Sequence, residues 1–190
     1  MRRLVLAVLI AVLGGCAVYK PPVVEPFADA KYWVLKELLQ YEVRNTGAVI
    51  TVPAGFVTDF ASIPSAFCVV LPKTGRYLAA AIMHDYLYWN QSCSREQADR
   101  ILDIAMEESQ VDFMTRRVIF AGVKAGGSTA WAANAKERSA GGIRLIPTPH
   151  LDIPVDKTWE EDQRMLIQRN VTDTSDRVDL RGACNAATPR

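Results

Sequence analysis

The stretch from Gly75 to Ala135 constrains the fold most, because its pattern predicts three consecutive helices. The first covers Gly75–Asn90, where apolar residues recur at the spacing of one helix face. Ser94 and Gln97 form a capping-box pattern, so we expect a second helix from there to about residue 110. Asp112 caps a third helix, which extends to about residue 135. The apolar stripe of the first helix comprises Leu78, Ile82, Tyr86 and Trp89.

Ahead of these helices the chain favours β-strands. Residues 32–43 mix apolar and charged side chains in a pattern that fits helix and strand alike. The Asn-Thr-Gly turn at 45–47 and the β-branched run Val49–Val52 favour a β-hairpin, and Phe56–Phe60 suits a further short strand. We therefore expect an α+β fold, in which a small antiparallel sheet formed by the N-terminal hairpin packs on a cluster of three α-helices.

An ionisable pair, His84–Asp85, lies inside the apolar first helix, where unpaired polar groups cost free energy. Tyr88 shares a helix face with His84, whereas Asp85 points about 100° away. If the first two helices form an antiparallel hairpin, Asp99 reaches the level of His84. A carboxylate that holds one imidazole nitrogen makes the other nitrogen a better general base. The alternative is a buried pair whose hydrogen bonds are only structural.

The first 15 residues resemble a bacterial lipoprotein signal, with two arginines, a short apolar run and small residues directly before Cys16. The resemblance implies cleavage before Cys16, acylation of that residue and, because Ala17 follows, an outer-membrane location facing the periplasm. An ordinary secretory signal or a buried strand is the alternative. We then expect a signal peptide over 1–15, a tether over 16–30, a globular domain over 31–138 and a polar, partly disordered extension over 139–190.

Three cysteines remain after lipidation: Cys68, Cys93 and Cys184. An oxidising envelope would let one pair close, and we expect Cys68–Cys93, because these two residues flank the first helix. Small buried thiols are the alternative. The formal net charge is only +1 and no basic cluster appears, so nucleic acid is not an expected partner.

Two separated motifs carry a family resemblance. VTDFASIP (residues 57–64) followed by HDYLY (residues 84–88) is similar to a family of small phage and bacterial proteins, domain of unknown function 1353. The likeness runs from about Tyr32 to Trp131 and includes the step Ala98–Asp99 and the Gly-Gly-Ser-x-x-Trp pattern that closes it. It implies phage or prophage ancestry and brings no established activity.

A second, shorter resemblance covers about residues 75–106. His-Asp-x-x-Tyr followed by Ala-Asp is similar to secreted and parvoviral phospholipases A2. The resemblance implies that His84 is the base, Asp85 a Ca²⁺ ligand, Asp99 the orienting acid and Tyr88 its helper. The chain departs from that pattern in its calcium loop, since residues 71–76 hold one glycine; Asp59 is a substitute side-chain ligand.

These observations favour a lipoprotein of phage type that is anchored in the membrane by its N-terminal lipid. We expect it to act at the cell envelope through binding, with an envelope or phage protein as partner. A phospholipase A2-like hydrolase of lipid esters is the alternative. Zinc proteases and serine hydrolases are not expected, because the chain has no His-Glu-x-x-His and no Gly-x-Ser-x-Gly. His150 and Asp152 are expected to be exposed loop residues.

Overall fold

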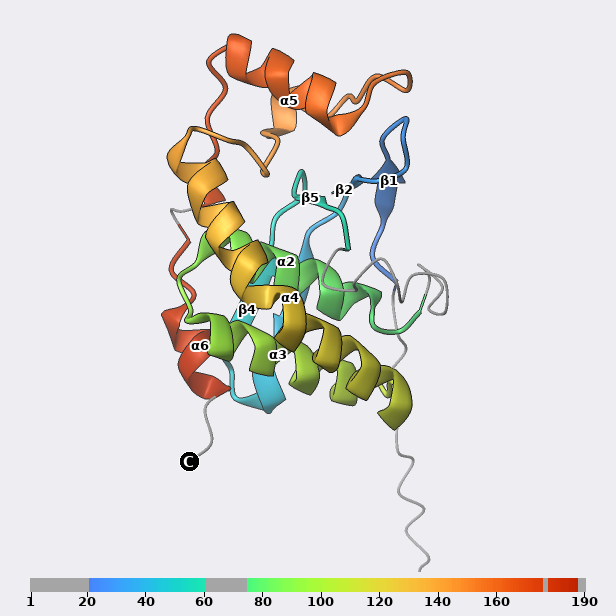
Figure 1. The fold of residues 1–190 in the computed structure, drawn as a ribbon, viewed down its shortest axis with the longest axis vertical. Helices are drawn as coiled ribbons and strands as arrows, with labels where there is room; N and C mark the ends of the chain where they lie inside the picture. Colours follow the sequence, from blue (N-terminus) through green and yellow to red (C-terminus); the bar gives the residue numbers. More distant parts are fainter. Residues whose placement is uncertain (1–20, 61–74, 176–177, 188–190) are drawn as a thin grey trace, which may run out of the picture.

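A computed structural model describes residues 21–60, 75–175 and 178–187, and its arrangement is α+β, as expected (Figure 1). Three predicted helices are present: α2 (Leu78–Asn90), α3 (Arg95–Glu108) and α4 (Phe113–Ser139). The described strands are β1 (Val24–Pro26), β2 (Trp33–Leu35), β3 (Leu39–Glu42), β4 (Val49–Val52) and β5 (Val57–Thr58). Shorter helical segments are η1 (Val43–Asn45), η2 (Thr148–His150), α5 (Trp159–Gln168) and α6 (Arg181–Ala186).

The helix starts follow the capping residues that the sequence contains. Ser94 accepts a hydrogen bond from the backbone N–H of Gln97, and the Gln97 side chain accepts one from the N–H of Ser94 in return. Asp112 accepts from the N–H of Thr115 at 3.0 Å. Each bond satisfies an N–H that the first turn of a helix leaves unpaired. The capping predictions for α3 and α4 are therefore confirmed, and α4 continues four residues beyond the expected end.

The strands form two small antiparallel sheets. β3 pairs with β4 as the predicted hairpin, in which Leu39 lies opposite Val52. A separate three-stranded sheet has the order β1-β2-β5. β1 lies within residues 16–30, and Phe27 directly after it is buried. The expected tether over 16–30 is therefore wrong for residues 24–27, because their backbone pairs with β2 and Phe27 packs on Trp159 with ring centroids 5.4 Å apart.

The main core lies between the β3-β4 hairpin and the helices α2, α3 and α4. Ile50 and Val52 of β4 are fully buried there, and the rings of Phe56 and Tyr86 meet edge to face at 5.2 Å. A smaller core joins Phe27 to α5 on the side of the three-stranded sheet. None of the helices in the described ranges combines the length and the apolar character that a membrane crossing requires.

Residues 178–187 pack against the helices, although they lie in the stretch 139–190 where we expected a polar, partly disordered extension. α6 packs its buried Ala183 and Cys184 into the main core. Arg100 of α3 donates from Nε to the carbonyl of Ala187 at 2.6 Å, which fixes the end of α6 on α3. Residues 178–187 therefore belong to the globular domain, because α6 buries Ala183 and Cys184 against the main core.

A disulfide joins this returning segment to the helices. It links Cys93, between α2 and α3, to Cys184 of α6, with 5.5 Å between the two Cα atoms. The expected Cys68–Cys93 pairing is thus wrong, because α6 brings Cys184 to Cys93. Cys68 and the helix entry predicted around Ser62 lie outside the described residues, as does Cys16.

Candidate functional site

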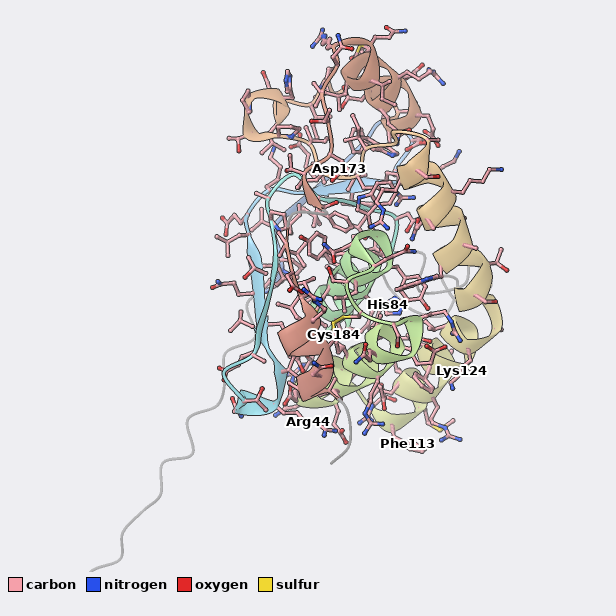
Figure 2. All side chains as sticks on the ribbon, turned by 90° about the vertical axis from the view of Figure 1, so that its left-hand side faces the viewer. Arg44, His84, Phe113, Lys124, Asp173 and Cys184 are labelled. Carbon is pink, nitrogen blue, oxygen red and sulfur yellow. A yellow bond between two sulfur atoms is a disulfide. The ribbon has the colours of Figure 1, made fainter. Side chains whose placement is uncertain are left out.

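A cavity of about 340 Å³ lies between α2 and α4. On the α2 side it is lined by His84, Asp85, Tyr88 and Trp89. The α4 side contributes mostly small residues, among them Gly122, Gly126, Ala130 and Ala133. Glycine and alanine leave room because they have little or no side chain, so the same α4 residues that let the helices approach also leave space beside His84. Figure 2 shows His84 between these helices, inside the protein.

His84, Tyr88 and Asp99 form one buried hydrogen-bonded group. His84 Nε2 lies 3.0 Å from Asp99 Oδ1, and the Tyr88 hydroxyl donates to the same oxygen at 2.5 Å. Arg95 donates from Nη1 to Asp99 Oδ2 at 3.0 Å. His84 is 1% exposed and Asp99 3%, so the contacts are shielded from bulk water. The predicted register between α2 and α3 therefore brings Asp99 and Tyr88 to His84.

The protonation states in this group follow from burial and from the shared carboxylate. Burial lowers the pKa of His84, and its hydrogen bond to Asp99 only partly offsets that effect, so the imidazole is neutral at pH 7. Because a carboxylate accepts but does not donate, the bond to Asp99 places the ring proton on Nε2. Burial, followed by the bond to Asp99, raises the pKa of Tyr88, which keeps its hydroxyl protonated as a donor. The basic nitrogen of the neutral ring is then Nδ1.

The two carboxylates proposed as calcium ligands both line the cavity, yet they do not complete a metal site. Asp85 accepts a hydrogen bond from the Thr58 hydroxyl at 2.5 Å, and Thr58 lies on β5 directly before Asp59. Within the described ranges no three or more His, Cys, Asp or Glu side chains gather where they could hold a metal ion. Ca²⁺ requires six to eight oxygen ligands. Asp59 and Asp85 alone do not reach that number, and residues 71–74 of the expected calcium loop lie outside the described residues, so we assign calcium no chemical step.

Arg95, Thr58 and Arg144 are among the residues at the site that sequence reasoning did not find. Arg95 pairs with Asp99 across one helical turn, and this i, i+4 spacing was the available signal. Thr58 has no signal of its own, because its contact with Asp85 spans 27 residues. Arg144 lines the cavity, and its guanidinium lies 5.4 Å from the Tyr32 ring centroid and 5.8 Å from that of Trp89.

The close approach of α4 to Tyr88 depends on Gly127. A Cβ atom at Gly127 would lie 2.5 Å from the Tyr88 hydroxyl oxygen, whereas one at Gly126 would meet nothing within 4 Å. We expect Gly127→Ala to lower the free energy of unfolding by roughly 1 to 3 kcal/mol, because Tyr88 must move away from Asp99. Gly126→Ala should instead be neutral or stabilising by up to about 1 kcal/mol. Urea unfolding of both variants measures this difference, and equal midpoints would contradict it.

Asp103, His150 and Asp152 do not join this group. Asp103, one turn after Asp99, pairs with Arg116 of α4 at 3.1 Å. Asp152 is exposed, as expected, and His150 is partly buried in η2, where it does not line the cavity.

About half of this chain matches a known protein family. Residues 33–123 match the family described as protein of unknown function (DUF1353). This range holds both motifs on which the resemblance rests and includes β2 to β5, α2, α3 and the first half of α4. No curated protein and no solved structure matches the chain.

Proposed function

We propose that this chain, whose residues 33–123 belong to the DUF1353 family, is a hydrolase that cleaves an ester of a lipid-like substrate in the cavity beside His84. The observation that carries the proposal is the buried Asp99 carboxylate, which holds both His84 and Tyr88 in a group that borders the cavity. A purely structural histidine needs a partner but no adjoining cavity. Here the imidazole has both.

The chemistry would be general-base hydrolysis. The Nδ1 atom of His84 takes a proton from water while the water oxygen attacks the carbonyl carbon of the ester. Asp99 stabilises the imidazolium that forms, as the carboxylate of a catalytic triad does. The ester C–O bond then breaks, and the imidazolium returns its proton to the leaving alkoxide, which departs as an alcohol. Arg144 and Asn134 line the cavity and supply N–H donors for the negative charge that develops on the carbonyl oxygen.

The substrate class follows from the size and lining of the cavity. Its volume of about 340 Å³ lies at the lower end of the range for small-molecule sites. The α4 wall, which consists mostly of glycine and alanine residues, suits an apolar chain better than a sugar or a nucleotide. A lipid anchor at Cys16, which we propose from the leader sequence, would hold the enzyme where such substrates are abundant.

Removing the base provides the direct test. Purified protein is incubated with phospholipid vesicles, and released fatty acid is measured for the wild type and for His84→Ala. We expect turnover to fall by roughly 10² to 10⁴ in His84→Ala, the range that general-base catalysis contributes. The control is His150→Ala, which replaces the other histidine and should retain wild-type turnover.

Two further conditions sharpen this test. Because burial lowers the pKa of His84, wild-type activity should be complete at neutral pH and fall only as the pH drops below the ordinary histidine value of 6.5. Turnover should be equal with Ca²⁺ and with EDTA, because the proposed mechanism uses the imidazole of His84 as the base and no metal ion. Equal turnover in the wild type and in a folded His84→Ala variant would contradict the proposal.

Binding without catalysis is the second candidate, and the burial of His84 favours it, because a purely structural histidine would also be 1% exposed and bonded to Asp99. In that case the lipoprotein alters the envelope by contact with an envelope or phage protein. Cells that express the wild type, His84→Ala or Cys16→Ala would be challenged with phage. Protection by His84→Ala together with loss of protection in Cys16→Ala would support binding and would count against hydrolysis as the cause.

A further inference from the structure

We propose that the exposed face at the start of α4 docks on an anionic lipid bilayer. This face, called here the outer face of α4, comprises Phe113, Met114, Arg117, Phe120 and Lys124. The inference rests on exposure, charge and helix geometry, and it depends neither on hydrolysis nor on the lipid at Cys16.

The most exposed apolar residues of this face are two large side chains that are adjacent in the sequence. Phe113 is 65% exposed and Met114 67% exposed, both at the first turn of α4. Single exposed apolar side chains are ordinary on a protein surface, whereas neighbouring ones mark interaction sites more often. Phe113 is the one large aromatic residue with this degree of exposure in the described part of the chain. A phenyl ring and a thioether chain at one helix end form a compact apolar tip.

Two basic side chains lie over the aromatic rings of the same face. The Arg117 guanidinium carbon is 5.6 Å from the centroid of the Phe113 ring, and Lys124 Nζ is 5.4 Å from that of Phe120. The four side chains lie on one stripe of α4, because successive members are four, three and four residues apart: Phe113, Arg117, Phe120 and Lys124. In Figure 2, Phe113 and Lys124 both lie at the end of the molecule opposite α5.

The positive charge of α4 favours a negatively charged partner. From Phe113 to Lys136 the sequence of α4 contains no aspartate and no glutamate. Arg116 points to α3, where it pairs with Asp103 and Glu107, so the basic charge of the outer face comes from Arg117 and Lys124. Long basic side chains beside apolar ones suit the interface of a bilayer, since the charged ends can extend to lipid phosphates while the apolar groups enter the acyl region. Complementarity of charge therefore favours anionic lipid.

The buried residues of α4 explain how the helix can lie on a membrane and still belong to the domain. Ile119 and Val123 are buried in the main core, whereas Phe113, Met114, Arg117 and Lys124 are exposed. α4 is thus amphipathic in an unusual way, because one face packs on α2 and α3 while the outer face offers apolar and basic groups to solvent. In this arrangement α4 rests along the bilayer surface.

Vesicle partitioning tests this inference. The full chain with Cys16→Ser, which cannot be lipidated, is sedimented with vesicles of phosphatidylcholine alone or mixed with phosphatidylglycerol. The added changes are Phe113→Ser with Met114→Ser, or Arg117→Gln with Lys124→Gln. The matched control is Val155→Ser with Ile167→Ser, two exposed apolar residues elsewhere on the surface. All variants share the same leader, so differences between them report the replaced side chains.

We expect the Phe113/Met114 variant to partition about tenfold more weakly into the mixed vesicles, since each lost apolar group removes part of the binding free energy. The Arg117/Lys124 variant should lose the preference for anionic vesicles, and added salt should weaken wild-type binding in the same way. The control should match the parent chain. Partitioning that is equal in the Phe113/Met114 variant and the control, or that ignores phosphatidylglycerol, would overturn the proposal and point to a protein partner for this face.

Discussion

Replacing Asp99 with alanine is expected to lower the free energy of unfolding by roughly 3 to 5 kcal/mol, the cost of breaking a buried charged contact from one side. Asp99 accepts hydrogen bonds from His84, Tyr88 and Arg95 while it is 3% exposed. Without the carboxylate, three donors lose their acceptor in a place that water does not reach easily. A loss of this size is a large fraction of the stability of an ordinary domain.

Two variants separate this effect from the mere loss of an acidic residue on α3. Asp103→Ala removes a partly exposed carboxylate that pairs with Arg116 at 3.1 Å, and it should cost less than about 1 kcal/mol. Asp99→Asn keeps the volume and one acceptor oxygen, so its loss should lie between the other two. The measurement is urea unfolding followed by tryptophan fluorescence. Similar unfolding midpoints for Asp99→Ala and Asp103→Ala would contradict the central role assigned to Asp99.

Removal of the Cys93–Cys184 disulfide is expected to have an effect of similar size on stability. The bond joins residues 91 positions apart, and closing so long a loop restricts the unfolded chain strongly. Replacing both cysteines with alanine should therefore lower the free energy of unfolding by roughly 2 to 5 kcal/mol. α6 should be the first element to detach, because it has only six residues and the disulfide fixes it next to α3.

Reduction of the wild-type protein provides the matching control. The reduced wild type and the Cys93→Ala/Cys184→Ala variant should show the same unfolding midpoint, which lies below that of the oxidised protein. Both cysteines are changed together so that neither thiol is left to pair with Cys68. Hydrogen exchange of the amides in α6 would show whether the loss begins there. An oxidised wild type that unfolds at the same urea concentration as the variant would refute this expectation.

Local patterns in the sequence predicted much of the helical layer and of the candidate site. The caps at Ser94 and Asp112 are short-range signals, because each side chain bonds to a backbone N–H three residues away. The contact between His84 and Asp99 could be predicted for a related reason. A short turn between two antiparallel helices fixes which residues lie at the same level, so counting outward from the turn identifies the pair.

Contacts between distant segments could not be predicted in this way. The partner of Cys93 depends on where residues 178–187 pack, and that segment has few apolar residues to indicate that it packs at all. The hydrogen bond from Thr58 to Asp85 joins a strand to a helix 27 residues later in the chain, and short-range sequence patterns do not predict a contact over that separation. Residues around Val24 suggested an extended linker because of their prolines, yet an extended backbone is also what a strand requires.

The early start of β1 limits how far the domain can stand from a membrane. If Cys16 carries the proposed lipid, seven residues lie between it and Val24, where the chain enters the sheet. The eight steps from one Cα atom to the next over this stretch span at most about 29 Å when fully extended, which is about the thickness of the hydrocarbon core of a bilayer. A tether this short would keep the outer face of α4 at a high effective concentration near the bilayer. The face would then be bound to lipid most of the time, even if its own affinity for the bilayer were weak.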